Sequence, residues 1–234
     1  MRILLFGATG MVGQGVLREC LLAPDVSEVV AIGRSPSGAS HPKLKDLVQA
    51  DLFDYRAIED RLGGFDACFF CIGVSSVRMD EGAYTHLTYD MTLGAATTLA
   101  RLNPGMSFVY VSGAGADSSE SGKTMWARVR GRTENALARL PFKRSHVIRP
   151  GMIQARHGAR SRTRAYRIIY PLLAPVLPLF RALMPHKVAT TQTIGRALLE
   201  LARHGYPKTV LETADIEEVA QRSAPPSHLS PGKT

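Results

Sequence analysis

Residues 7–15 read GATGMVGQG, and they join a predicted strand to a predicted helix. The preceding run RILLFG (2–7) is short and apolar, which is typical of a buried strand, and MVGQGVLRECLLA (11–23) has apolar residues at helical spacing. The spaced glycines permit a tight turn, a close approach of the backbone to a pyrophosphate, and close packing of the helix on the strand. A helix N-terminus also offers N–H donors and a positive dipole to an anion. The stretch therefore predicts the phosphate-binding turn of a dinucleotide-binding unit.

The rest of the chain alternates short apolar runs with longer helical patterns. The predicted strands cover residues 2–7, 28–33, 45–50, 66–73, 106–113, 144–151 and 209–214. The predicted helices cover residues 11–23, 54–62, 88–102, 125–140 and 190–205. Such alternation implies βαβ units, so we expect an α/β fold: a doubly wound, Rossmann-like parallel sheet with helices on both faces and a small C-terminal substrate lobe.

The length of 234 residues favours one domain, which we expect to cover residues 1–222. Within it, residues 151–207 are expected partly to form a lobe that covers the substrate. The Pro/Ser-rich end of the chain, residues 223–234, is predicted to be disordered.

Cysteine and histidine usage gives no sign of a metal or redox site. The chain has three cysteines, which favours a reducing compartment over a disulfide framework. Cys68 and Cys71 form a CxxC pattern, but they lie in the predicted strand DACFFCIG, where residues three apart point to opposite faces. The seven histidines show no HExxH or similar tight spacing, so we expect no metal.

The apolar stretches are too short to predict a membrane span or a signal peptide. The N-terminal MRILLFGATG has a short apolar core that runs directly into the glycine turn. The run IIYPLLAPVLPLF (168–180) is interrupted by three prolines. From these observations we expect a cytoplasmic protein.

The net charge of +9 is unevenly distributed along the chain. No acidic residue occurs between Glu134 and Glu200, and RHGARSRTRAYR (156–167) carries five arginines, which favours an anionic partner. We expect no specific nucleic-acid partner, because no dedicated motif is present and aromatic residues are few. Residues 165–184 have two interpretations: a lid over the substrate, or a segment that makes weak contact with an anionic membrane surface.

Ligands of parallel sheets bind beyond the carboxyl ends of the strands, where the glycine turn lies. Contacts with the cofactor phosphates are therefore expected from Gly7, Thr9, Gly10, Met11, Val12 and Gly13. After the second predicted strand, an acid would bind the ribose of NAD, whereas an arginine accommodates the 2′-phosphate of NADP. The chain has IGRSPSG there, with Arg34 and Ser35 and no acid. We therefore expect NADP(H) to be preferred over NAD(H).

Six strand-end motifs occur in a recognisable order: GATGMVGQGVL, IGRS, QADLFD, CIG, VSGAG and IRPG. Together they resemble the short-chain dehydrogenase/reductase superfamily, in its atypical or extended, epimerase-like branch that binds NAD(P)H. The resemblance covers residues 1–155 well and the remainder loosely. It implies that Asp51 and Leu52 lie near the adenine and that Cys71, Ile72 and Gly73 border the cofactor ribose. It further implies that Ser112 is the active-site serine and that Pro150 and Gly151 flank the nicotinamide.

The sequence departs from that superfamily on the helix after the fifth strand. The family places a tyrosine there as general acid/base, and a lysine four residues later that holds the ribose. In MWARVRGRTENAL these positions hold Trp126 and Arg130. An indole cannot shuttle a proton, whereas Arg130 can still donate to a ribose, so cofactor binding is expected to persist and ordinary carbonyl reduction is in doubt. Trp126 also has the simpler interpretation of a packed core residue.

Two functional hypotheses follow. In the first, the protein is an NADP(H)-dependent oxidoreductase or epimerase-like enzyme acting on an unknown hydrophobic or anionic small molecule, with Ser112, Trp126 and Arg130 as catalytic candidates. In the second, it binds NADPH without catalysis and acts as a sensor or scaffold. The missing tyrosine favours the second hypothesis, and Ser112 with the preserved strand ends favours the first.

Overall fold

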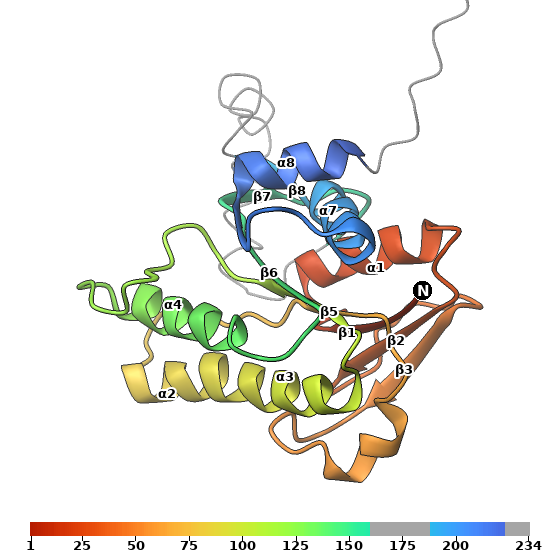
Figure 1. Cartoon of the computed structure of the whole chain (residues 1–234), viewed down its shortest axis with the longest axis horizontal. Helices are drawn as coiled ribbons and strands as arrows, with labels where there is room; N and C mark the ends of the chain where they lie inside the picture. The colour runs from red at the N-terminus through yellow and green to blue at the C-terminus, as the bar shows by residue number, and fades with distance from the viewer. Residues whose placement is uncertain (160–187, 223–234) are drawn as a thin grey trace, which may run out of the picture.

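A computed structural model describes residues 1–159 and 188–222. Its centre is a seven-stranded sheet in which every neighbouring pair is parallel, in the order β3-β2-β1-β4-β5-β6-β9 (Figure 1). The strands are β1 (Arg2–Phe6), β2 (Glu28–Gly33), β3 (Leu44–Val48), β4 (Ala67–Phe70), β5 (Ser107–Val111), β6 (Arg144–Arg149) and β9 (Val210–Glu212). The order reverses between β1 and β4, and such a reversal opens a crevice at the carboxyl ends of the strands.

Helices cover both faces of this sheet (Figure 1). One face carries α1 (Met11–Leu22), α7 (Thr191–His204) and α8 (Thr213–Arg222). The other carries α2 (Glu81–Thr85), the π-helical turn η2 (His86–Asp90), α3 (Met91–Leu102) and α4 (Met125–Leu137). The predicted doubly wound, Rossmann-like architecture is therefore confirmed.

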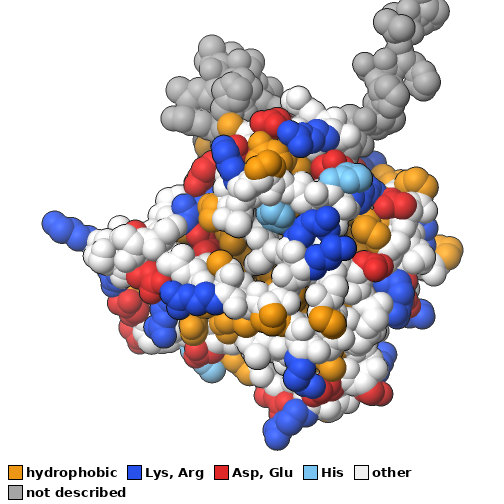
Figure 2. Space-filling model, viewed as in Figure 1, with side chains coloured by type: hydrophobic (Ala, Val, Ile, Leu, Met, Phe, Trp, Pro, Cys, Tyr) orange, Lys and Arg blue, Asp and Glu red, His pale blue; other side chains and the backbone are white. Residues whose placement is uncertain are grey.

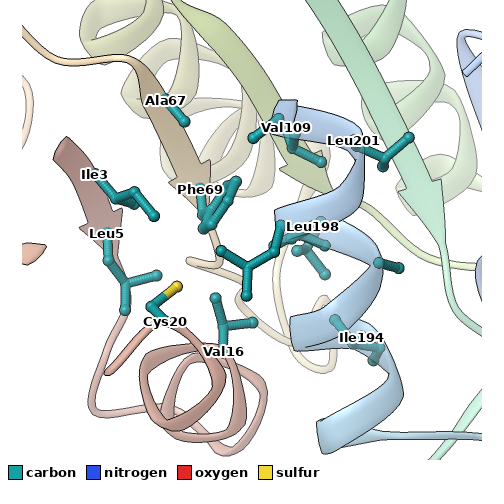
Figure 3. Packing of buried hydrophobic residues seen from close by; sticks show 14 of the residues in the cluster. Ile3, Leu5, Val16, Cys20, Ala67, Phe69, Val109, Ile194, Leu198 and Leu201 are labelled. Atoms are coloured by element: carbon teal, nitrogen blue, oxygen red, sulfur yellow. The ribbon is translucent and has the colours of Figure 1, made fainter. Parts of the chain in front are cut away.

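The core has two layers, one on each side of the sheet. The first packs Leu5 and Phe69 against Val16 of α1 and Leu198 of α7 (Figure 3). Two glycines bring these helices together: a Cβ on Gly15 would lie 2.5 Å from the Cβ of Thr191, and one on Gly195 would lie 2.8 Å from the Cγ of Glu19. The second layer packs alternate strand residues against α3 and α4, including Leu4, Phe6, Phe70, Phe108, Leu99 and Leu137.

The two cysteines of the CxxC pattern point to opposite sides of the sheet, as strand alternation predicts. Cys68 belongs to the core layer beneath α3, whereas Cys71 packs against the layer beneath α1. Both thiols are free. The predicted placement of the two thiols on opposite faces of the sheet is therefore confirmed.

Several elements differ from the sequence-based expectation. The helix expected at 54–62 is the 3₁₀-helix η1 (Arg56–Arg61), and four elements were not predicted: α2, α8, β7 (Met152–Gln154) and β8 (Val188–Thr190). Strands β7 and β8 pair in a separate parallel ladder and are too short for periodicity to reveal them. A local signal for α2 does exist, because Asp80 caps it by accepting from the backbone N–H of Ala83.

The lid or membrane-surface segment at 165–184 and the tail at 223–234 lie outside the described residues, as does the central part of the expected substrate lobe. Among the described residues, no helix combines the length and apolar character needed to cross a bilayer. On the face shown in Figure 2, Lys and Arg side chains are interspersed with Asp and Glu rather than gathered in one patch.

Candidate cofactor and substrate cleft

A cleft of about 480 Å³ lies at the carboxyl ends of the strands. Its volume is in the range typical of small-molecule sites. The residues predicted from sequence that line it are Gly7, Thr9, Gly10, Met11, Val12, Arg34, Ser35, Leu52, Cys71, Ile72, Gly73, Ser112 and Arg130. An apolar wall completes the lining, formed by Val74, Leu87, Met91, Val111 and Ile153. Residues from five strand ends and from the helical elements α1, η2, α3 and α4 thus meet in one place.

Two glycines of the turn, Gly7 and Gly13, have no room for a side chain. Gly7 has a φ of +79°, and a Cβ there would lie 2.8 Å from the carbonyl carbon of Cys71. A Cβ on Gly13 would lie 2.0 Å from the oxygen of Gly7, so Gly13 packs α1 against the turn instead of lining the cleft. Gly10 stands at the N-cap of α1, and no side chain caps this end. Because the first N–H groups of a helix have no partner within it, these donors fit the phosphates of a dinucleotide.

The edge of the cleft near β2 is basic. Arg34 and Ser35 follow this strand directly, are exposed, and line the cleft. Asp51 does not line it, because its carboxylate accepts from the backbone N–H of Phe53 at 2.8 Å and so holds the local turn. The neighbouring Leu52 is buried and supplies the apolar contact on this side.

Arg130 of α4 reaches across the ends of β4 and β5. Its Nε donates to the hydroxyl of Tyr84 at 3.0 Å. A Cβ on Gly73 would lie 3.9 Å from Nη2, and one on Gly113 would lie 3.6 Å from Nη1, so the terminal nitrogens lie beside two strand-end glycines. Burial opposes the charge of this guanidinium, but the phenols of Tyr110 and Tyr84 and the carboxylate of Glu134 together outweigh burial, so that the pKa of Arg130 lies above its ordinary value. Arg130 is therefore a fixed cation in the cleft.

Ser112 is buried at the end of β5 and is already engaged. Its hydroxyl donates to Oε1 of Glu134 at 2.5 Å. Oε2 of Glu134 accepts from Nη2 of Arg149, also at 2.5 Å. Since a hydroxyl has a single hydrogen, Ser112 can present only acceptor lone pairs to a ligand while this bond is made.

Besides Gly13 and Asp51, three further predicted residues do not line the cleft. Trp126 packs with its ring against the loop after β5, where a Cβ on Gly115 would lie 3.3 Å from Cη2. Pro150 accepts through its carbonyl from the N–H of Ala114, and the N–H of Gly151 donates to Oγ1 of Thr213. These groups hold the rim of the cleft together.

Sequence reasoning missed Tyr84, Glu134 and Arg149. Tyr84 is 1% exposed and meets Arg130 across 46 positions of sequence, so no local pattern reveals it. Glu134 was detectable in principle, because it follows Arg130 by four residues and so shares its face of the helix. Its contact with Ser112 nevertheless depends on how α4 packs on β5.

The sequence matches the NAD(P)H-binding family over residues 7–144. Protein fmp52, mitochondrial, from Emericella nidulans is 27% identical over 158 residues, which are 64% of this chain and 66% of that protein. Protein HTATIP2 from Rattus norvegicus is 27% identical over 154 residues, which are 64% of this chain and 62% of that protein. The matched region thus covers slightly less than two thirds of either relative.

The fold is shared with a solved oxidoreductase of the short-chain dehydrogenase/reductase family from Burkholderia thailandensis. That structure has a TM-score of 0.65 and 16% sequence identity, over 93% of this chain and 92% of that chain. The chain therefore shares the fold of an atypical short-chain dehydrogenase/reductase, as the resemblance implies, and its family match is to NAD(P)H-binding proteins.

The expected cytoplasmic location is contradicted by these comparisons, because the fmp52 relative is named as a mitochondrial protein. The expectation rested on few cysteines and on short apolar runs. These features indicate a reducing compartment and the lack of a predicted span, and they do not distinguish one such compartment from another.

Proposed function

We propose that this chain, which belongs to the NAD(P)H-binding family, is an NADP(H)-dependent oxidoreductase that acts on a small molecule. The observation that carries the choice of cofactor is Arg34, an exposed cation directly after β2 on the edge of the cleft, with no acid beside it. In this fold that position meets the ribose 2′-substituent, where an arginine favours a phosphate.

Each part of the cleft has a distinct task in this proposal. The uncapped start of α1 and the glycine turn hold the pyrophosphate, and Arg34 with Ser35 holds the 2′-phosphate. The bound cofactor supplies a hydride donor or acceptor. Ser112, fixed by Glu134, offers an oxygen that accepts a hydrogen bond from the ligand, and the apolar wall excludes water from it.

A direct test is calorimetric titration of the wild-type protein and of Arg34→Ala with NADPH and with NADH. Wild type should bind NADPH at least about tenfold more tightly, since one charge-assisted contact contributes about 1.5–3 kcal/mol. Arg34→Ala should narrow that gap without weakening NADH. Arg222→Ala is the matched control, because this arginine pairs with Glu218 on α8, away from the cleft. Equal affinities of wild type for the two cofactors would refute the assignment.

A second candidate, a non-catalytic NADPH sensor or scaffold, is favoured by one observation. No tyrosine lines the cleft among the residues at 1–159 and 188–222, so a phenolic proton donor is lacking there. The two functions separate in a turnover assay with NADPH and a panel of apolar aldehydes, ketones and keto acids. Oxidation of NADPH that depends on one of these compounds supports the enzyme, and tight NADPH binding without turnover of any supports the sensor.

A further inference from the structure

We propose that Arg130 binds the carboxylate of an apolar organic acid, which is the substrate class of the cleft. This inference rests on the proposed function, in that the acid occupies the cleft beside the cofactor. A guanidinium at this position binds a carboxylate more specifically than the ammonium group of a lysine would.

The first argument is that no carboxylate of the described residues is in contact with Arg130, since Glu134 acts on it only at longer range. Its one hydrogen-bond partner among the described residues is the hydroxyl of Tyr84, and a phenol contributes an oxygen but no charge at neutral pH. Burial raises the pKa of the second nearby phenol, Tyr110, to about 12, so it is also neutral at pH 7. Arg130 is half-buried, and a cation that is partly shielded from water without an anion in contact favours an anionic ligand.

The chain itself has no carboxylate to spare for this arginine. No Asp or Glu is among the described residues that line the cleft. Glu134 lies one helical turn further along α4, but both its oxygens are occupied by Ser112 and Arg149. The undescribed stretches at 160–187 and 223–234 contain no Asp or Glu in their sequence. A carboxylate in direct contact with this guanidinium would therefore come from a ligand.

The second argument concerns which nitrogens of the Arg130 guanidinium remain available to a ligand. Because Nε is bonded to Tyr84, the edge that remains is the pair Nη1 and Nη2. This pair lies beside Gly73 and Gly113, and Arg130 is one of the residues that line the cleft. Two parallel N–H groups match the two oxygens of a planar carboxylate, whereas a lysine ammonium is a point charge without such a fork.

The third argument is the character of the neighbouring wall. Leu87, carried by the π-helical turn η2, lines the cleft together with Met91, Val74, Val111 and Ile153. A ligand that satisfies both features has a carboxylate at one end and an apolar body at the other. Ser112 adds an acceptor for a hydroxyl or N–H group on that body.

The same guanidinium could instead serve the cofactor, through a phosphate or ribose hydroxyl, so the experiment must separate these two sources. The probes are octanoate and octanamide, which have the same shape and differ in charge. Each is titrated calorimetrically into the protein alone and into the protein saturated with NADP⁺. The variants are Arg130→Ala, Arg130→Lys and the control Arg222→Ala, and the dissociation constant of NADP⁺ is measured for each.

With NADP⁺ bound, wild type and Arg222→Ala should bind octanoate at least about tenfold more tightly than octanamide, the ratio that one charge-assisted contact provides. Arg130→Ala should lose this ratio, and its affinity for NADP⁺ should fall by a smaller factor than its affinity for octanoate. Arg130→Lys, the conservative variant, should retain part of the ratio and serves if the alanine variant does not fold. Equal binding of the two probes to wild type would overturn the proposal. So would a loss of NADP⁺ affinity in Arg130→Ala with octanoate binding intact, because the guanidinium would then serve the cofactor.

The outcome is independent of the cofactor assignment. If wild type binds no NADP⁺, the proposed function fails, while the titration of octanoate and octanamide into the protein alone still decides whether Arg130 selects a carboxylate.

Discussion

Arg130 and Arg149 both lie near the carboxyl ends of β5 and β6, yet their surroundings are opposite. Arg149 donates to Glu134 at 2.5 Å and to Ser118 at 2.6 Å, and it also reaches Glu212. Arg130 has the neutral hydroxyl of Tyr84. The first arrangement is complete without a ligand and ties α4 to β6. The second is incomplete, and incompleteness of a cation inside a cleft is typical of a binding residue.

The largest expected effect on stability comes from breaking the ion pair between Arg149 and Glu134. Glu134→Gln should lower the free energy of unfolding by about 3 kcal/mol, because it removes the buried anion of Arg149 and leaves it only the exposed carboxylate of Glu212. The two side chains are 11% and 2% exposed, so water replaces little of the lost interaction. Urea denaturation followed by circular dichroism measures the change. In the exposed control Glu218→Gln the change should stay within about 0.5 kcal/mol. A loss of unfolding free energy below about 1 kcal/mol for Glu134→Gln would contradict the claim that Arg149, unlike Arg130, is held in place to support the fold.

The next largest effect tests whether the hydroxyl of Tyr84 orients the guanidinium of Arg130. Tyr84→Phe should weaken octanoate binding about three- to tenfold, since its hydroxyl fixes Nε and thereby the orientation of the Nη pair, a contribution of about 0.5–1.5 kcal/mol. Tyr89→Phe is the control, because its ring packs beneath Arg132 on the surface rather than against Arg130. Titration of octanoate into both variants decides the matter. Unchanged affinity in Tyr84→Phe would mean that the hydroxyl does not position the guanidinium.

A smaller effect comes from a third arginine, Arg203, which pairs with Asp25 at the surface. The hydrogen bond from Arg203 holds the pKa of Asp25 below its ordinary value of 3.8. A carboxyl with a lowered pKa in the folded state adds stability above the unfolded pKa and loses it as the pH falls through the folded one. Asp25 is 44% exposed, so Asp25→Asn should cost at most about 1 kcal/mol at pH 7.

The pH dependence of the stability loss shows whether Asp25→Asn acts by removing the ion pair with Arg203 or by some other structural change. The difference between wild type and Asp25→Asn should shrink towards zero in urea denaturations carried out from about pH 4 downward. A difference that stays constant over this range would show that the substitution acts through something other than the ion pair.

Sequence reasoning located the cleft because the rule behind it is topological. Parallel strands deliver their carboxyl ends to one edge, so Gly10, Arg34, Cys71 and Ser112 could be placed together once the strands were recognised. Arg130 was found by its spacing on a predicted helix. These inferences need the order of elements and little else.

The remaining features depend on packing that no local pattern encodes. Tyr84 meets Arg130 because α2 lies beside α4, and α2 has only five residues. Ser112 donates its hydrogen to Glu134 because Arg149 holds the Glu134 carboxylate in place. This arrangement needs α4, β5 and β6 to pack so closely that all three side chains are within hydrogen-bonding distance. Trp126 occupies the expected helix position but turns to the loop at Gly115, since a side chain's direction is set by its neighbours.

The smallest expected effect is the sharpest test of the comparison. Replacing Arg130 and Tyr84 together, as Arg130→Met with Tyr84→Phe, removes an uncompensated cation and its partner while keeping their approximate shapes. The free energy of unfolding should then stay within about 1 kcal/mol of wild type or rise above it, because replacing both partners of a buried polar pair by apolar groups is close to neutral. Urea denaturation without ligand measures the free energy of unfolding of both proteins.

Adding octanoate should raise the free energy of unfolding of wild type by mass action and leave that of the double variant unchanged. A loss as large as that of Glu134→Gln would show that Arg130, like Arg149, is held in place to support the fold, and its free Nη pair would then need another explanation than a ligand.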